Sequence, residues 1–463
     1  MFAETRSDSP VKPVDPEWAW APYKPDSRRP WNLPRAGHLY RRAGFGANWD
    51  ELQRALADGP RHTVDRMLHP EADIEEFNRG YDDYEAAAAD SGSGDGLRAW
   101  WLRRMIHTPH PLLEKMTLFW HNHFAISNLR VGNAPLIERY LQLLRSHALG
   151  PLAPLWQAVW RDPAVLLGTE AAENRKALPN ENFARALLEH FGPGPGNFGP
   201  GDVTDAARAL TGCFVRRGRF RFLDREHDSG VKKILGQQGN WGGDDAVRIV
   251  LAQPATSKRL VEKLYRWLIS ETDEPGDTLL APLAELLAGD HDFSKLVEKM
   301  LRSNLFFSDM AYRQRVKSPV EFAVGIVRAM EGNVPTVRLG QDLATLGQDL
   351  CCPPTIKGWP TSRDWINSAA LVGRSNLALA LLSGSKPYGD KLDPAALVKK
   401  HGCSGPARAG RFMLDLFLQG DLAAGAAEDL RKTAGTPGTA AGKSPRLRRF
   451  VHAVVTLPEF QLA

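Results

Sequence analysis

The stretch Lys115-Met-Thr-Leu-Phe-Trp-His-Asn-His-Phe124 combines strongly apolar side chains with two histidines separated by a single residue. It lies within residues 112–124, where apolar residues recur at spacings of three and four, a pattern that predicts a helix. Neutral imidazole is a common metal ligand and the usual proton carrier near neutral pH. His121 and His123 are therefore the first candidates for a functional site.

The rest of the chain shows the same helical periodicity, interrupted by proline and glycine, over most of its length. One region differs, because phenylalanine alternates with arginine over residues 219–222 after a glycine, as in a β-hairpin. Residues 1–35 are rich in proline and tryptophan, which favours an extended arm packed on the body. We expect a mainly α, multi-helix globular protein with a short β-hairpin near residues 214–222 and an extended, Pro/Trp-rich N-terminal arm.

The length of 463 residues predicts more than one hydrophobic core. We expect three parts: the extended arm over residues 1–35, a helical lobe over residues 36–270 that carries the polar site, and a C-terminal helical lobe over residues 271–463. The net charge of +5 is small for this length, and the arginines are scattered in pairs. Both observations argue against nucleic acid as a partner.

The cysteines and the hydrophobic runs bear on the compartment. Four cysteines are too few and too irregularly spaced for a disulfide framework, and none forms a Cys-x-x-Cys zinc pair. No apolar run resembles the core of a signal peptide, and none reaches transmembrane length. We therefore predict a cytoplasmic protein that does not bind a membrane.

A second group of candidates opens a predicted helix at residues 179–190. Glu181, Arg185 and Glu189 are four residues apart and lie along one helical face. Glu181 is the preferred carboxylate, and Arg185 could orient it or bind an anionic substrate as a planar fork. An ion-pair ladder in solvent would give the same spacing. The flanking asparagines favour the functional interpretation, because asparagine suits caps and polar contacts better than helix interiors.

A third group follows the predicted hairpin, where His227 and Asp228 precede Gly230 and Lys232. A loop after a strand can present side chains to a cleft without burying unpaired backbone groups. The alternative is a turn in which Asp228 only bonds its own backbone. The residues alone leave both interpretations open.

Several strings of this chain, in fixed order over nearly its whole length, resemble the bacterial family catalogued as domain of unknown function 1800. We call them the family strings: HLYRRAGFG (38–46), MTLFWHNHF (116–124), NENFAR (180–185), ARALTG (207–212), HDSGVK (227–232), QPAT (253–256), GWP (358–360), WINS (365–368) and PEFQ (458–461). Similar proteins usually carry an acidic residue at the position of Ala186 and a tryptophan at that of Cys213. The resemblance implies no reaction, cofactor or substrate. It does imply a partner resembling the alkaline-phosphatase and sulfatase superfamily.

Together these residues predict a metal-assisted enzyme, hydrolytic or oxidative, with a His/carboxylate pocket built by three distant segments. Their nitrogen and oxygen atoms suit a divalent transition metal, Zn, Mn or Fe, that would acidify a bound water. The predicted metal ligands are His121, His123, Glu181 and His227. The predicted catalytic residues are Asp228, Arg185 and Lys232.

This prediction depends on the end of one helix. Positions two apart on an ideal helix point about 200° apart, so His121 and His123 reach one site only if the helix ends there. Residues 127–132 would supply that end. The alternative is that one histidine packs in the core and the other reaches the surface.

Two other classes of function remain open. The first is a non-catalytic binding or assembly protein, in which the polar strings form a buried hydrogen-bond network and the tryptophan-rich arm docks a partner. The second is an anion-binding regulatory module that uses Arg41, Arg42 and Arg185, although such arginines more often form salt bridges at helix ends. Elemental analysis separates the enzyme from the network, because only the enzyme requires a transition metal.

Overall fold

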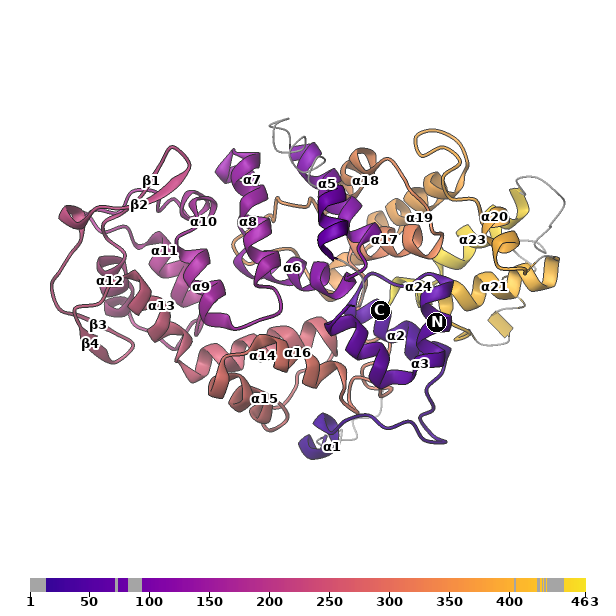
Figure 1. Cartoon of the computed structure of the whole chain (residues 1–463), viewed down its shortest axis with the longest axis horizontal. Coiled ribbons are helices and arrows are strands. Elements are labelled where there is room, and N and C mark those ends of the chain that lie inside the picture. Colours follow the sequence, from indigo (N-terminus) through magenta and orange to yellow (C-terminus); the bar gives the residue numbers. More distant parts are fainter. Residues whose placement is uncertain are drawn as a thin grey trace.

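The structure is a computed structural model that describes residues 14–70, 74–81, 94–403, 405–422, 425, 426, 428, 430 and 445–463. Over these residues the chain is mainly helical and contains two small antiparallel sheets of two strands each. The two sheets lie at one end of the elongated molecule, and the helices α20 (Pro394–Lys400), α21 (Pro406–Leu418) and α23 (Pro445–Thr456) lie at the opposite end (Figure 1). The mainly α fold class is thus confirmed.

The helices before the first strand are α1 (Pro16–Trp20), α2 (Leu33–Ala43), α3 (Trp49–Leu68), α5 (Gly94–His107), α6 (Pro111–Phe124), α7 (Asn128–Val131), α8 (Ala134–Ser146), α9 (Leu152–Trp160), α10 (Pro163–Gly168), α11 (Glu181–Arg185) and α12 (Pro200–Ala209). A π-helix, Ala186–Phe191, continues α11. The helices after the last strand are α13 (Gly243–Leu251), α14 (Pro254–Leu268), α15 (Asp277–Asp290), α16 (Phe293–Leu301), α17 (Pro319–Ala329), α18 (Thr336–Thr345), α19 (Ser368–Leu382), α20 (Pro394–Lys400), α21 (Pro406–Leu418), α23 (Pro445–Thr456) and α24 (Pro458–Gln461).

The predicted hairpin is present. Strand β1 (Cys213–Arg216) pairs antiparallel with β2 (Arg219–Phe222), and Arg216 lies opposite Arg219 next to the turn. A second pair, β3 (Lys232–Ile234) and β4 (Gln237–Gly239), follows it and was not expected from the sequence. Short ladders of three residues carry too little alternation to be recognised from the sequence.

The described part of the N-terminal arm, residues 14–32, lies against the body. The buried Trp20 of α1 donates from Nε1 to the Leu279 carbonyl at 2.7 Å, and Trp31 donates to the Ala55 carbonyl at 2.9 Å. Each indole thus has an apolar surface and a satisfied N–H, as a packed tryptophan requires. Residues 1–13 of the predicted arm lie outside the described residues.

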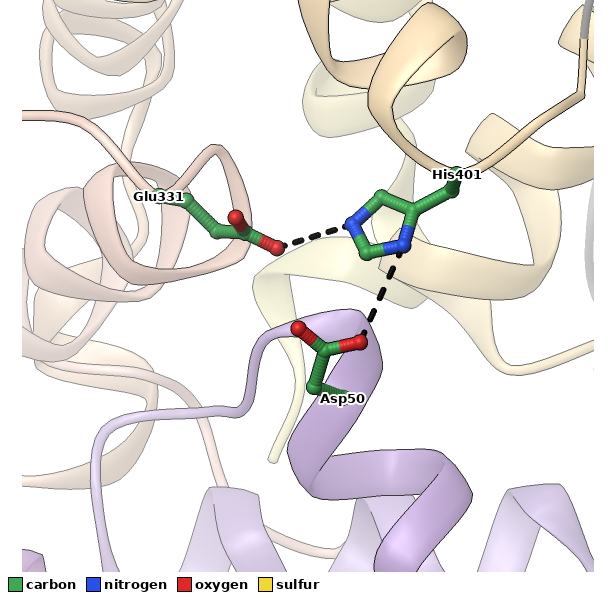
Figure 2. Close-up of side chains that lie close together, drawn as sticks. All are labelled: Asp50, Glu331 and His401. Carbon is green, nitrogen blue, oxygen red and sulfur yellow. Dashed lines mark hydrogen bonds and ion pairs between the residues drawn. The ribbon is translucent and has the colours of Figure 1, made fainter.

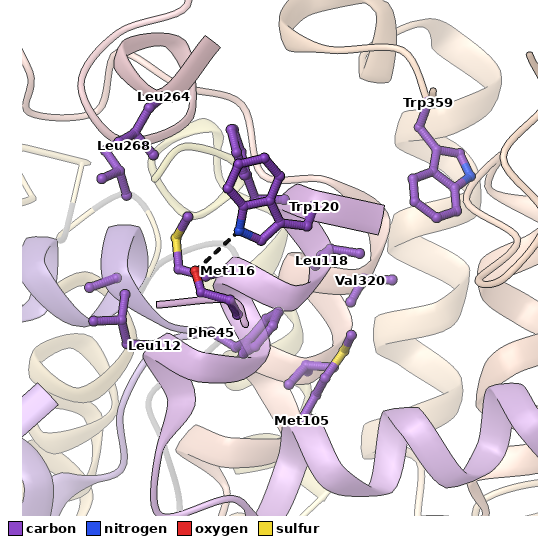
Figure 3. Close-up of a cluster of buried hydrophobic side chains, with 14 of the residues drawn as sticks. Phe45, Met105, Leu112, Met116, Leu118, Trp120, Leu264, Leu268, Val320 and Trp359 are labelled. Atoms are coloured by element: carbon purple, nitrogen blue, oxygen red, sulfur yellow. Dashed lines mark hydrogen bonds between the residues drawn. The ribbon is translucent and has the colours of Figure 1, made fainter. Parts of the chain in front are cut away.

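Almost every side chain of helix α6 is buried, so this helix runs through the core. Pro111 occupies its first turn, where a missing N–H costs nothing. The helix ends at Ala125, which adopts a left-handed conformation with φ of 51° and donates to the His121 carbonyl. Figure 3 shows Met116 and Trp120 of α6 among other buried apolar side chains. Burying each such side chain contributes roughly 1.5–3 kcal/mol.

The division into two lobes stays a prediction. Helix α14 packs against α15 across the expected boundary at residue 270, and α2 contacts both α14 and α21. A backbone bridge also joins Val316 to Leu462 near the C-terminus.

Among the described residues, no helix is long and apolar enough to cross a membrane.

Candidate functional site

His121 lies in a fully buried aromatic cage. Its ring centroid is 5.4 Å from that of Trp101, 5.8 Å from Tyr140 and 5.3 Å from Trp359. Neither ring nitrogen has a hydrogen-bond partner among the described residues. Burial lowers the pKa of His121 to about 3. The side chain is therefore a neutral ring held by aromatic contacts in the core. The alternative interpretation expected the other histidine at the surface, but His123 is buried as well.

His123 faces other elements, because α6 remains a regular helix through both histidines. Its Nδ1 accepts a hydrogen bond from the Lys263 ammonium at 3.0 Å, and its ring packs against Trp120, Phe124 and Phe191. Burial, reinforced by the charge of Lys263, lowers the pKa of His123 well below its usual value. Burial also lowers the pKa of Lys263 to about 7. The two imidazoles thus belong to different environments.

Glu181 and Arg185 form an ion pair on the surface of α11. The Arg185 guanidinium donates to Glu181 at 3.0 Å, and the two side chains are 54% and 41% exposed. The Thr204 hydroxyl donates to the other Glu181 oxygen at 3.0 Å. Asn180 caps the helix by accepting from the Asn182 amide. This arrangement corresponds to the solvated ion pair that the spacing left open.

The family string that begins with Asn180 leads into the π-helix Ala186–Phe191, a geometry that is frequent at functional sites. Ala186 and His190 line a cavity of about 100 Å³ together with the buried Ser127, whose hydroxyl has no hydrogen-bond partner among the described residues. Residues 353–356 close the cavity from the other side. Ala186, the position where the family resemblance implies an acidic residue, therefore faces this cavity. Alanine supplies no carboxylate there.

His227, Asp228 and Lys232 are bonded to their own loop and to the end of α12 and the residues just after it. His227 donates from Nδ1 to the Thr211 carbonyl at 2.8 Å. Asp228 accepts from Arg208 at 2.7 Å and from the Gly230 amide at 2.8 Å, and the bond from Arg208 is the main cause that lowers the pKa of Asp228. The Lys232 ammonium donates to the carbonyls of Asp228 and Gly230. These contacts organise the turn between β2 and β3.

The four predicted metal ligands lie in four separate environments. His121 and His123 lie on different sides of the buried α6, and only His123 is bonded to a lysine. Glu181 lies on the surface of α11, and His227 lies in the 227–232 loop. Within the described part of the chain, one group of His, Cys, Asp and Glu side chains brings three ligand atoms within 4.8 Å of one another, and it contains Asp50, Glu331 and His401 (Figure 2). The sequence analysis missed this group, because its members come from three distant segments with no shared motif.

Asp50 lies in the first turn of α3, Glu331 is the second residue after α17, and His401 directly follows α20. His401 contacts Glu331 through Nε2 at 3.0 Å, and its Nδ1 lies 3.8 Å from Asp50 (Figure 2). A partly open cavity of about 380 Å³ adjoins Asp50 and Glu331. One imidazole and two carboxylates suit Zn, Mn or Fe. Lys400 also contacts both carboxylates, and its ammonium would compete with a metal.

A buried ion cluster links α5, α6 and α8 around Glu114. The carboxylate accepts from Trp101 at 2.9 Å, from Arg104 at 3.2 Å and from Arg145 at 2.8 Å. Burial would raise the pKa of Glu114, but the two arginines outweigh it and the pKa is lowered. The carboxylate is therefore ionised and holds three helices together.

A second buried cluster surrounds Glu321 of α17. It accepts from Arg315 at 2.5 and 3.1 Å, from the Ser318 amide at 2.7 Å, and from the ammonium of Lys115. Burial alone would raise the pKa of Glu321, but Arg315 and Lys115 lower it strongly. Burial lowers the pKa of Lys115 to about 8. Lys115, the first residue of the stretch Lys115–Phe124, therefore forms a buried ion pair within the fold.

Comparison with known proteins gives a match to one family model, described as "Protein of unknown function (DUF1800)", over residues 38–462. All of the family strings lie within the matched residues, which confirms the resemblance seen in the sequence. No curated protein and no solved structure matches the chain.

Proposed function

Since the chain belongs to the DUF1800 family of proteins of unknown function, we propose its function from its own residues: it is a non-catalytic binding protein whose polar strings form a buried network. The observation that carries the proposal is the way in which these polar groups are bonded. Glu114 and Lys115 hold buried ion clusters, and His123 accepts a bond from Lys263. Asn122 accepts at 2.7 Å from the Trp359 amide of another family string.

Such a network supports binding because it makes the core rigid and uniquely arranged. Each buried polar group has to keep its partners, since an unsatisfied group costs about 1–3 kcal/mol. A rigid core holds cavities and surfaces at its edge in fixed positions, which reduces the entropy lost when a ligand binds. The catalytic alternative would need several of these residues to point into one cleft.

A metal-assisted enzyme remains the second candidate, and one observation favours it. Asp50, Glu331 and His401 bring three ligand atoms together beside an open cavity that could admit water and a substrate. A three-ligand site with an open position is the arrangement of many catalytic metals. Lys400 is the argument against it, because its ammonium already contacts both carboxylates and would compete with a metal ion.

Metal content tests both candidates in one experiment. The protein is produced in medium containing zinc, manganese and iron salts, passed over a desalting column and analysed by mass spectrometry for bound metals. The variants are His123→Ala, His401→Ala and, as a matched control, His62→Ala, whose side chain is 74% exposed. We expect no stoichiometric transition metal in any of the four proteins. We also expect a lower unfolding temperature for His123→Ala, because Lys263 loses its acceptor.

Two other outcomes would contradict the binding proposal. Stoichiometric metal that disappears only in His401→Ala would establish the second candidate. Stoichiometric metal that disappears in a folded His123→Ala protein would instead support the metal site first predicted from the sequence. Circular dichroism distinguishes loss of metal from loss of fold.

A further inference from the structure

A small cavity between α2, α17 and α21 is lined by two buried basic side chains, Arg41 and Lys317. Its volume of about 20 Å³ leaves room for one or two water-sized atoms. The walls also include Phe45, Phe417 and Phe460, and one carboxylate residue, Glu321, lines the cavity as well. Charges beside such walls interact more strongly than they would in water.

Lys317 brings a charge into this cavity without a hydrogen-bonded partner. The side chain is only 5% exposed. Among the described residues, none accepts a hydrogen bond from its ammonium, which lies 3.6 Å from the centroid of the Phe460 ring. A buried ammonium normally has a paired anion or several acceptors, because isolated burial of a charge is costly. Burial lowers the pKa of Lys317 well below its usual value, and the nearby Arg41 adds to this effect.

Arg41 is incompletely bonded in the same place. One of its terminal nitrogens donates to the Gln419 side chain, whereas Nε and Nη2 have no partner among the described residues. The guanidinium lies 5.5 Å from the Tyr312 ring centroid, which offers only a weak interaction. Gln419 itself is held in position by a bond from its amide to the Leu416 carbonyl at 2.6 Å.

The neighbouring carboxylates are already bound to other cations. Glu321 is held by Lys115 and Arg315, and Asp421 lies 3.4 Å from Arg313. Among the described residues around the cavity, six basic side chains are buried, together with two carboxylates, Glu271 and Glu321. The basic residues are Arg41, Arg42, Lys115, Arg315, Lys317 and Arg374. Backbone carbonyls bond Arg42 and Arg374. Among the described residues, no backbone carbonyl accepts a hydrogen bond from the side chain of Arg41 or Lys317.

We propose that this cavity binds a small monovalent anion, presented as one or two water-sized acceptor atoms, between the Lys317 ammonium and the Arg41 guanidinium. A halide ion and the carboxylate of a small organic acid share this chemistry. Sulfate and phosphate present four oxygen atoms and carry more than one negative charge, so they do not match a site for one or two acceptor atoms of a monovalent anion. The inference builds on the binding function proposed above and adds a class of ligand to it.

A competing explanation is that Lys317 is buried as a neutral amine and needs no counter-ion. The two explanations differ in a measurable way. A ligand that binds only the folded protein raises its unfolding temperature in proportion to the logarithm of its concentration, whereas a neutral amine gives no such dependence.

The test uses the full chain in sodium gluconate, whose anion is too large for the cavity. Chloride, bromide, formate, acetate or sulfate then replaces gluconate at constant ionic strength, and the unfolding temperature is recorded. We expect a rise of about 2 °C for each tenfold increase in small-anion concentration above the dissociation constant. Sulfate should have no effect. Chloride without formate would identify an inorganic ion, and formate or acetate without chloride a carboxylate ligand.

Two lysine variants separate the cavity from general salt effects. Lys317→Met keeps the length of the side chain and removes the ammonium, so it should abolish the response to small anions. Lys299→Met removes an exposed lysine of α16 and should keep the response of the wild type. An unchanged response in Lys317→Met, or none in the wild type, would overturn the proposal.

Anomalous diffraction from wild-type crystals in bromide does not depend on the folding of any variant. A bromide peak between Lys317 and Arg41 supports the site for a halide. For a carboxylate ligand, the corresponding observation is formate density in crystals grown in formate. If neither bromide nor formate density is found and the protein is also free of metal, only the anion site is contradicted. Metal bound at His123 would instead contradict the binding function itself.

Discussion

Replacing His121 by leucine should change the acid stability of the protein without impairing its fold. His121 is completely buried, touches three aromatic rings and has two ring nitrogens without partners among the described residues. Leucine has a similar volume and no polar atom to bury. At pH 7 the His121→Leu protein should therefore be as stable as the wild type, or more stable by up to about 1–3 kcal/mol.

The pH dependence follows from the lowered pKa of His121. An ordinary histidine in the unfolded chain takes up a proton as the pH falls below 6.5, but folded His121 does so only near its pKa of about 3. The unfolded state therefore binds more protons, and the stability is lost progressively as the pH falls from 6.5 toward 3. Between pH 7 and pH 5 this single group should lower the free energy of unfolding by about 2 kcal/mol.

Urea unfolding at pH 7 and pH 5, followed by tryptophan fluorescence, measures this difference. Trp101 and Trp359 contact the His121 ring, so the signal reports on this part of the core. The wild type should lose about 2 kcal/mol more than His121→Leu between the two pH values. His62→Leu, at an exposed histidine, should behave as the wild type. Equal losses in wild type and His121→Leu would show that His121 is protonated in the fold and would refute the cage.

Two further substitutions test the buried network. Glu114→Gln leaves Arg104 and Arg145 buried without their carboxylate and should lower the free energy of unfolding by about 3–5 kcal/mol, whereas Glu262→Gln at a surface pair should cost about 1 kcal/mol or less in the same urea experiment. Gly358→Ala should lower the unfolding temperature more than Gly236→Ala: both glycines have φ near 90°, but only at residue 358 would the new methyl lie 2.1 Å from the Asn122 side chain. Equal losses within either pair would contradict these assignments.

The helices and the first hairpin could be predicted because their signals are local. Apolar residues at three and four spacing mark α6, and the alternation of residues 219–222 marks β2. The π-helix could not be predicted in this way, since its extra residue per turn depends on the packing of Phe191 and its neighbours in the folded chain. The sequence around it reads as an ordinary helix.

The proposed convergence of the histidine pair required the helix to end at the pair, with residues 127–132 supplying that end. The helix instead continues through both histidines and ends after Phe124, where Ala125 takes the left-handed conformation. The packing of Trp120 and Phe124 explains the difference, because both rings are buried in the core and stack on each other at a centroid distance of 5.7 Å. Ending the helix earlier would expose apolar surface, so the core fixes the helix end.

The Asp50–Glu331–His401 group shows the opposite limit. Glu331 and His401 are 70 residues apart, and Asp50 comes from the first turn of α3. Each has an ordinary local role, as an acidic residue in a first turn or a polar residue after a helix end. Only the fold of the whole chain brings their atoms together, and no single segment of the sequence indicates the group.

Arg41 and Arg42 show why even a correct sequence clue needs the fold. Their adjacent positions in the sequence suggested a pair of anion ligands, but adjacent positions on a helix point about 100° apart. Nη2 of Arg42 therefore donates to the Ile269 and Ala311 carbonyls within the core. Arg41 reaches the cavity beside Lys317. An anion site thus requires a second cation from far along the chain, and the lysine just before α17 supplies it.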